Sequence, residues 1–196
     1  EAFTAGGWDW DSIYEINTVD RDSYAQASTE IVGGTPSNPT TAGASGAAGT
    51  LTVSLASDTP AAGVAVKNAA RVPFTKVNLT AGSSAVTVNG LTVQRTGLAD
   101  DAAISSVALI DASTGLQVGL NQTLNAAHQV TFNEAITIPA NTTKSYILAA
   151  NMPAALTNYA GQIASLSLVG VNNAATISGT LPITGNGQTL NATLSI

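Results

Sequence analysis

The sequence predicts an all-β protein, an antiparallel β-sandwich preceded by one separate extension strand. Short segments in which apolar and polar residues alternate recur along the chain, and turn residues separate them at intervals of roughly 8–12 residues. Only 9% of the 196 residues are charged, so the Glu, Lys and Arg that favour solvent-exposed helices are scarce. Cysteine is absent, which excludes disulfides, thiolate metal sites and thiol nucleophiles.

The extension strand is predicted over residues 8–19, which read WDWDSIYEINTV. Its apolar face consists of four residues at even positions, Trp8, Trp10, Tyr14 and Ile16. Its opposite face is mainly acidic or polar and includes Asp9 and Asp11. Alternation with a period of two is typical of a strand with one buried and one wet face.

Three parts follow from composition: an N-terminal arm (residues 1–32), a Gly/Pro/Ser/Thr-rich linker (33–49) and a β-rich body (50–196). The first 31 residues hold seven acidic residues and one basic residue, while the remainder holds five of each, so the net charge of −6 belongs to the arm. The linker shows no periodicity, and when fully extended it spans roughly 55 Å at about 3.3 Å per residue.

The first body strands are predicted over residues 50–57, 64–70, 72–80 and 86–95. Residues 58–63, DTPAAG, form a turn between the first two. Pro73 predicts that the third strand begins at a sheet edge, because proline cannot donate a ladder hydrogen bond.

Residues 86–95, VTVNGLTVQR, admit two interpretations because the apolar residues of the two halves lie in opposite phases. We prefer a hairpin that turns at Asn89-Gly90, since both residues suit positive φ angles. The alternative is one long strand whose phase is reset by a β-bulge.

Further strands are predicted over residues 107–111, 116–119, 129–138, 144–151, 161–171, 175–178, 181–184 and 188–196. A total of about nine to eleven short strands is typical of an Ig-like or jelly-roll-like sandwich.

The body resembles β-sandwich modules in large surface proteins of uncultured, small-genome bacteria. The resemblance covers about residues 50–140 and is carried by four segments: DTPAAG at 58–63, VPFTKVNLTA at 72–81, LTVQRTG at 91–97 and ISSVALID at 104–111. It implies a sandwich fold, a cell-surface location and structural work, and it brings no catalytic residues.

The arm is similar in assembly logic, though not in sequence motif, to subunits that polymerise by donor-strand exchange, such as chaperone–usher pilins and the TasA and camelysin family. We interpret it as a strand lent to the next copy, where Trp8, Trp10, Tyr14 and Ile16 fill a groove. The alternative is an ordinary first strand that folds back on its own domain. The expected function is therefore a structural subunit of an extracellular filament. A carbohydrate-binding or adhesive module, with the arm's rings as a stacking platform, and a surface-layer tile are the competing functions.

Catalysis is not expected. His128 is the only histidine, it has no obvious acid beside it in sequence, and no nucleophile-elbow motif is present. We therefore expect His128 in a surface turn, and we expect no cofactor. Asp9 and Asp11 share a strand face and are weak candidates for a hard cation. Four N-x-S/T triplets are possible glycosylation sites: Asn78, Asn121, Asn141 and Asn191.

The expected partner is a further copy of the same chain, with glycans as a second possibility. The chain has no basic patch, so nucleic acid is not expected. No apolar run is long enough to cross a membrane. A sequence that begins at Glu1 and is rich in Thr, Ser and Asn predicts a processed, exported protein.

Overall fold

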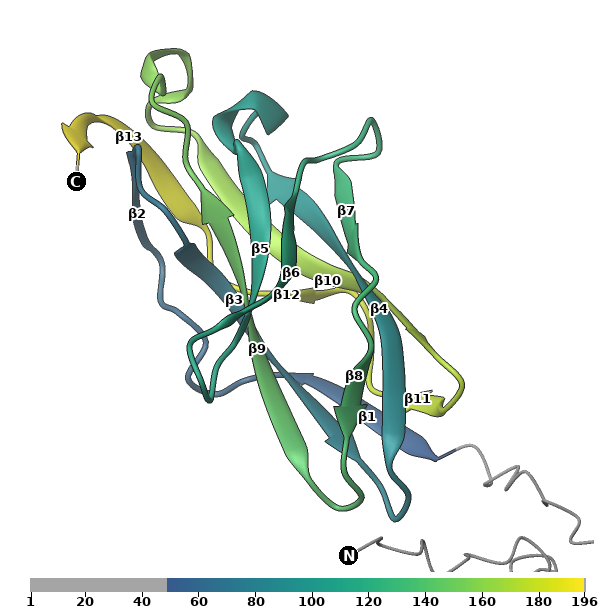
Figure 1. Cartoon of the computed structure of the whole chain (residues 1–196). Helices are drawn as coiled ribbons and strands as arrows, with labels where there is room; N and C mark the ends of the chain where they lie inside the picture. The colour runs from purple at the N-terminus through teal and green to yellow at the C-terminus, as the bar shows by residue number, and fades with distance from the viewer. Residues whose placement is uncertain (1–48, 196) are drawn as a thin grey trace, which may run out of the picture. The chain divides into compact units, whose positions relative to one another are not determined.

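The computed structural model describes residues 49–195, which form thirteen strands and two short 3-10 helices (Figure 1). The predicted arm, and the predicted linker up to residue 48, lie outside these residues. The described chain forms two β-sheets whose inner faces share one hydrophobic core. The predicted all-β sandwich is therefore confirmed.

The first sheet has six strands, in the order β11 (Thr176–Ser178), β1 (Thr50–Leu55), β3 (Val72–Ala81), β9 (Thr143–Asn151), β5 (Ser106–Asp111) and β6 (Gln117–Gln122). The second sheet runs in the order β2 (Gly63–Lys67), β13 (Gln188–Ser195), β10 (Ile163–Asn173), β4 (Val86–Gly97) and β7 (Gln129–Phe132). Two shorter strands complete it, β12 (Ile183–Thr184) beside β10 and β8 (Ile136–Ile138) beside β4.

Most neighbouring strands are antiparallel, as the sequence predicts. Each sheet nevertheless has one parallel pair at an edge, β1 with β11 and β2 with β13. Parallel strands cannot be joined by a tight turn, so a parallel neighbour comes from a distant part of the chain. Local turn signals in the sequence therefore do not reveal these two pairs.

The core follows from the alternation seen in the sequence. In β1, Leu51 and Val53 are buried, whereas Thr50, Thr52 and Ser54 are exposed. The same period places apolar side chains of both sheets on facing inner surfaces. The largest fully buried side chains include three aromatic rings, Phe74, Phe132 and Tyr146.

Residues 86–95, for which the sequence admits either a hairpin or one long strand, form part of a single strand. β4 runs unbroken from Val86 to Gly97 and pairs with β10 from Val88 to Gly97. The preferred hairpin at Asn89-Gly90 is therefore wrong, and the long strand with a bulge is correct. The register shifts where Gly90 and Val88 face successive residues of β10, which leaves Asn89 without a register partner. The extra residue explains the change of phase.

Packing, and not turn geometry, explains the glycine in this bulge. A Cβ atom on Gly90 would lie 2.9 Å from the backbone oxygen of Phe132. The bulge also divides the strand predicted over residues 129–138. Its first part, β7, pairs with Leu91–Gln94, and its second part, β8, pairs with Val86–Val88.

β3 lies between β1 and β9 and is therefore not an edge strand over most of its length. However, β1 pairs with β3 only from Val77 onward, while β9 reaches Val72. Pro73 therefore lies where β3 has a strand partner on one side only, and this explains how its missing N–H is tolerated.

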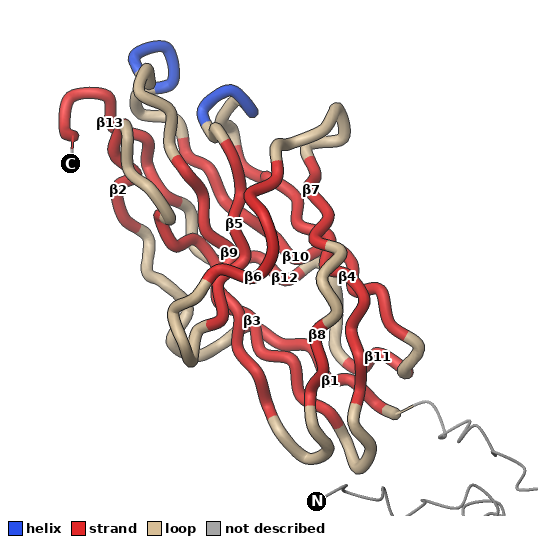
Figure 2. The backbone as a smooth tube through the Cα atoms, viewed as in Figure 1, coloured by secondary structure: helices blue, strands red, loops and turns tan. Residues whose placement is uncertain are grey.

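The two ends of the sandwich differ. Figure 2 shows both 3-10 helices, η1 (Asp101–Ala103) and η2 (Thr157–Tyr159), at the end where β13 finishes. The β3–β4 and β8–β9 turns lie at the opposite end, where the Asn141 N–H donates to the Gly82 carbonyl oxygen at 2.7 Å. The remaining predicted strands are present within a few residues of their expected bounds.

Candidate functional site

The open edges of the two sheets are the first candidate for a binding site, because an unpaired strand edge can accept another strand. The edge at β6 is irregular. Its register against β5 shifts between Val118 and Gln122, and Gly119 has a φ angle of 68°. A side chain on Gly119 would collide with the Glu134 carboxylate, which approaches from the β7–β8 connection. Bulges and covering side chains are features that protect an edge from pairing.

The other edge of the first sheet, where the short strand β11 leaves part of β1 uncovered, is different. The Ala56 N–H donates to the Lys76 carbonyl oxygen at 2.9 Å, and the Gly82 N–H donates to the Thr50 carbonyl oxygen at 2.8 Å. In an antiparallel ladder, residues alternate in the direction of their backbone polar groups. The N–H and C=O groups of Leu51, Val53 and Leu55 therefore point away from β3, toward the outer edge.

β11 covers only part of that edge. It pairs with Thr50, Leu51 and Thr52, and the pairing ends at Ser178. Gly179 still lies against the Val53 carbonyl oxygen, since a Cβ atom there would meet it at 2.3 Å. Beyond that point, no strand among residues 49–195 pairs with Leu55 on its outer side, and 42% of Leu55 is exposed.

A groove of about 520 Å³ opens at this place. It is lined by residues 52–55 of β1 and by residues 178–180 and 182–184, and thus lies between β1 of the first sheet and β12 of the second. Its lining includes the buried core residues Val53 and Ile183 together with exposed Leu55. None of its lining residues is charged. The groove is therefore an uncharged surface, part apolar and part hydroxyl-bearing, beside the uncovered end of β1.

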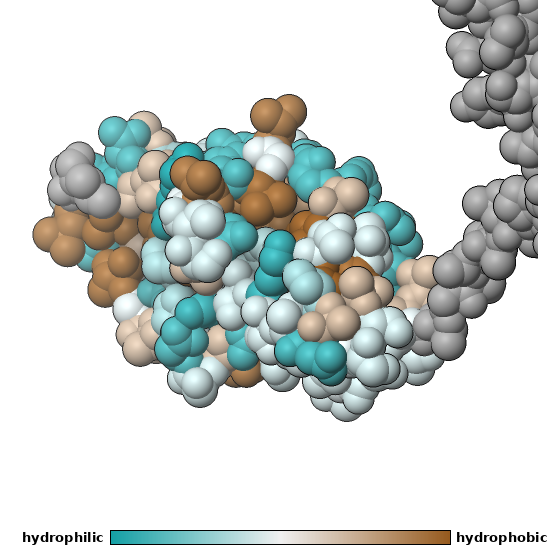
Figure 3. All heavy atoms as spheres, turned by 60° about the horizontal axis from the view of Figure 1, so that its bottom comes forward, coloured by the Kyte–Doolittle hydropathy of each residue, from teal (hydrophilic) through white to brown (hydrophobic). Residues whose placement is uncertain are grey.

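Exposed hydrophobic residues elsewhere are dispersed. Figure 3 shows hydrophobic residues in several separate groups among hydrophilic ones on the face it views. The most exposed large ones in the described chain are Leu98, Leu120, Leu116, Leu194 and Val64. Single exposed apolar residues are ordinary on protein surfaces.

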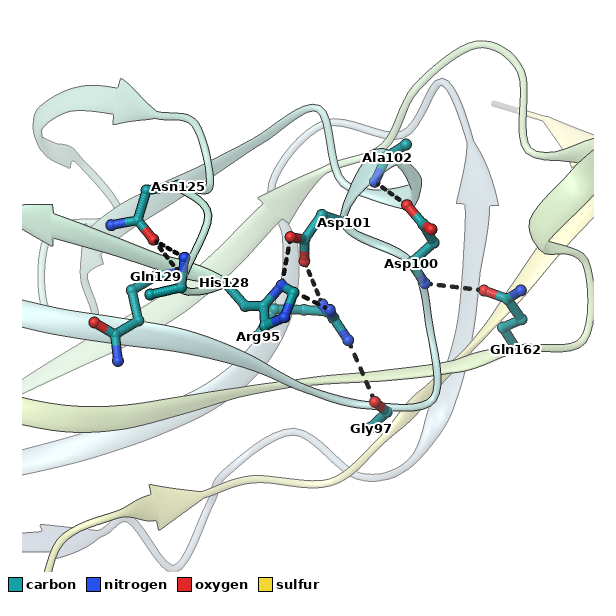
Figure 4. A network of polar contacts seen from close by, with 10 residues as sticks. Arg95, Gly97, Asp100, Asp101, Ala102, Asn125, His128, Gln129 and Gln162 are labelled. Atoms are coloured by element: carbon teal, nitrogen blue, oxygen red, sulfur yellow. Dashed lines mark hydrogen bonds and ion pairs between the residues drawn. The ribbon is translucent and has the colours of Figure 1, made fainter.

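The second candidate is a polar cluster around Asp101 (Figure 4). Arg95 on β4 donates from Nε to Asp101 Oδ1 at 2.6 Å, and His128 Nδ1 lies 2.6 Å from Asp101 Oδ2. His128 lies in a turn with a φ angle of 60°, and the side-chain oxygen of Asn125 accepts backbone hydrogen bonds from that turn. The prediction of a surface turn at His128 is confirmed. No acid neighbours His128 in sequence, but the fold brings Asp101, 27 residues earlier, against its ring.

Opposing effects set the ionisation of this carboxylate. Burial by itself raises the pKa of Asp101, but the hydrogen bonds from His128 and Arg95 outweigh it and hold the pKa below its ordinary value. Asp101 is therefore a carboxylate at neutral pH. The described contacts of the His128 ring are with Asp101 and Arg95 and include no hydroxyl group. The cluster is an ion-pair clamp that ties η1 to the β4–β7 pair.

The sequence-predicted site residues fall into two groups. Trp8, Trp10, Tyr14, Ile16, Asp9 and Asp11 lie outside the described residues. Of the four candidate glycosylation residues, Asn121 on β6 and Asn141 in the β8–β9 turn are exposed, and Asn78 and Asn191 are partly buried. Asn78 accepts a hydrogen bond from the Ser145 hydroxyl at 2.7 Å.

Neither a metal site nor a stacking platform stands out in the described chain. Residues 49–195 contain no group of three or more His, Asp or Glu side chains placed to hold a metal ion. The aromatic rings of this part are buried at Phe74, Phe132 and Tyr146, and Tyr159 packs partly buried against the core. No helix in this part is long and apolar enough to span a bilayer.

Comparisons with known proteins leave the chain without a family. No family model matches the sequence, and no curated protein matches it. A solved structure with some likeness is a family 123 glycoside hydrolase from Clostridium perfringens, studied for glycolipid glycan hydrolysis, with 14% sequence identity and a TM-score of 0.35. The match covers 73% of this chain and 27% of that enzyme. A likeness this weak carries no inference about this chain's activity.

Proposed function

We propose that this protein is a structural subunit of an extracellular filament, in which the arm of one copy adds a strand to the sandwich of the next. The observation that carries the proposal is the incomplete edge of the first sheet, where the outward polar groups of β1 end beside an uncharged groove between the sheets. The arm has the matching pattern, with one apolar and one acidic face. The proposal assigns no catalytic role to the chain.

The apolar face of the arm is large enough to hold two copies together. Each buried aromatic side chain removes on the order of 150–250 Å² from water. Three such rings, Trp8, Trp10 and Tyr14, give roughly 11–19 kcal/mol of gross stabilisation at about 25 cal/mol per Å². Association costs an estimated ~4–15 kcal/mol in lost freedom. Backbone hydrogen bonds along the added strand further favour a long-lived junction.

The geometry of such a contact explains polymerisation. A strand given to one neighbour and a groove that receives another neighbour's strand form a head-to-tail interface, which extends into a filament when it does not close. The acidic face of the arm keeps it soluble before docking, because like charges repel neighbouring arms.

Deletion of residues 1–32 tests the proposal. The full chain should form filaments visible by negative-stain electron microscopy and sediment as large species, whereas the truncated chain should remain monomeric or fail to complete its fold. Filaments formed by the truncated chain would contradict the proposal. Within the full chain, Trp10→Ala should weaken assembly strongly, while Ile13→Ala, on the opposite face of the same strand, is the matched control and should assemble.

A carbohydrate-binding function makes a different prediction. Because the aromatic rings of residues 49–195 are buried or partly buried, a glycan platform would have to be formed by the arm. Glycan-array binding by the monomeric full chain, lost on Trp8→Ala and Trp10→Ala without any change in assembly, would favour that function over the filament.

A further inference from the structure

β11 is the most weakly integrated strand of the first sheet. All three of its residues, Thr176, Ile177 and Ser178, are exposed, and none of them belongs to the hydrophobic core. It is attached to β1 through three register pairs in the parallel orientation, in which pairing is slightly less stable per residue than in antiparallel strands. Its detachment from β1 would break only these three register pairs.

The groove and β11 lie along one strand edge. β11 covers Thr50–Thr52, and the groove adjoins residues 52–55. If β11 left, the outer edge of β1 would be open over its whole length, Thr50–Leu55. Strands in globular proteins are typically about 5–6 residues long, so the freed edge could receive one complete strand.

We infer that the β1 edge is the acceptor for residues 8–19 of a second copy, and that β11 is a placeholder strand which that segment displaces. This inference rests on the proposed function. The lining of the groove is uncharged and reaches Val53 and Ile183 of the core. The inference places the Trp8/Trp10/Tyr14/Ile16 face of the incoming strand against this lining and the acidic face toward solvent.

The chain enters β1 at the end of the strand opposite to the groove. The Thr176 N–H donates to the Gly49 carbonyl oxygen at 2.9 Å, so the chain enters β1 beside β11. The groove, in contrast, adjoins the Leu55 end of β1. A linker that spans roughly 55 Å when extended gives the chain's own arm the reach to compete for this edge, so the cross-linking test uses two differently tagged copies and scores only the links between them.

Disulfide cross-linking between two differently tagged full-length copies tests the acceptor site. The chain has no native cysteine, so every cross-link reports the introduced pair. One copy carries Ser54→Cys, at an exposed position of β1, and the other carries Asp11→Cys, Ile13→Cys or Glu15→Cys in turn. These arm positions share the outward face, so at least one should lie within disulfide reach of Ser54 when the strand is docked. Val64→Cys, at an exposed position of the β2 edge, is the matched control acceptor.

A second variant tests the displacement of β11. Thr52 and Ser178 are register partners and both are exposed, so Thr52→Cys combined with Ser178→Cys locks β11 onto β1 when oxidised. The oxidised double variant should lose filament assembly and regain it on reduction, while oxidised Thr52→Cys alone should assemble normally.

The outcomes separate the inference from the function on which it rests. Cross-links between copies at Ser54→Cys, with little at Val64→Cys, together with loss of assembly in the locked variant, are the expected result. Filaments that cross-link at Val64→Cys, or at neither position, overturn the β1 acceptor while the filament function stands. Normal assembly of the locked variant overturns the displacement of β11. Absence of filaments from the unsubstituted chain refutes the proposed function itself.

Discussion

The Asp101 clamp gives a stability prediction with a defined pH dependence. Asp101→Asn removes a carboxylate that accepts hydrogen bonds from two side chains, at 2.6 Å from Arg95 Nε and at 2.6 Å from His128 Nδ1. Hydrogen bonds to charged groups contribute about 1.5–3 kcal/mol each. Because the Asn oxygen can still accept one of them, we expect a loss of about 2 kcal/mol at pH 7.

The sign of the pH effect follows from the direction of the shift. The folded pKa of Asp101 lies below its ordinary value, so its contribution is present above the unfolded pKa of about 3.9 and disappears as pH falls through the folded pKa. The difference between the parent chain and Asp101→Asn should therefore be large at pH 7 and small near pH 2.

Urea unfolding followed by far-ultraviolet circular dichroism measures this difference. With a slope of about 2 kcal/mol per M, the midpoint should fall by about 1 M at pH 7. The matched control is Asp100→Asn, which removes the same charge one residue away. Asp100 caps η1 by accepting a hydrogen bond from the Ala102 N–H at 2.8 Å. Asn is an equally good cap, so Asp100→Asn should leave the urea midpoint nearly unchanged. Equal midpoints for the two variants at pH 7, or a difference that persists undiminished at pH 2, would refute the reasoning.

Three further predictions concern the core. Leu166→Ala, at a fully buried position, should cost about 2–5 kcal/mol in urea unfolding, and Leu120→Ala, at a residue that is 75% exposed, should change stability by less than about 0.5 kcal/mol; similar costs would show that the two exposures are misassigned. Gly90→Val should destabilise by about 1–3 kcal/mol, because its Cβ would press on the Phe132 carbonyl oxygen, and an unchanged midpoint would contradict the tight bulge. Burial, with a contribution from nearby acid, raises the pKa of Tyr146 to about 12, so stability should decline between about pH 10 and 12 as the unfolded phenol ionises; Tyr146→Phe should flatten that decline, and an equally steep decline in the variant would contradict the assignment.

Local alternation was sufficient to predict most strands, because the period of two reports directly which side chains face a core. It failed at Asn89-Gly90, where a residue pair that suits a hairpin turn instead forms a bulge inside a long strand. Glycine is required at position 90 because the Phe132 backbone of β7 approaches too closely for a side chain. That requirement depends on a strand some 40 residues away, and no local pattern contains it.

The Asp101 cluster and the groove beside β1 could not be predicted from the sequence either, because both depend on which distant segments pair. His128 has no acid near it in sequence, and Asp101 reaches it only because β4 pairs with β7. The groove depends on the length of β11, which stops at Ser178 and leaves the end of β1 uncovered. The two parallel pairs likewise join segments more than 100 residues apart, and turn signals carry no information about them.

The most direct test of strand donation uses the tryptophans of the arm. Trp8 and Trp10 are the only two in the chain, so intrinsic tryptophan fluorescence reports the environment of the arm alone. It should be measured across protein concentration, with iodide quenching, beside sedimentation velocity on the same samples. We predict exposed, red-shifted and quenchable emission in the monomer, and blue-shifted, protected emission that appears together with the sedimenting polymer. Protected emission from a monomer, or exposed emission from a polymer, would contradict the account.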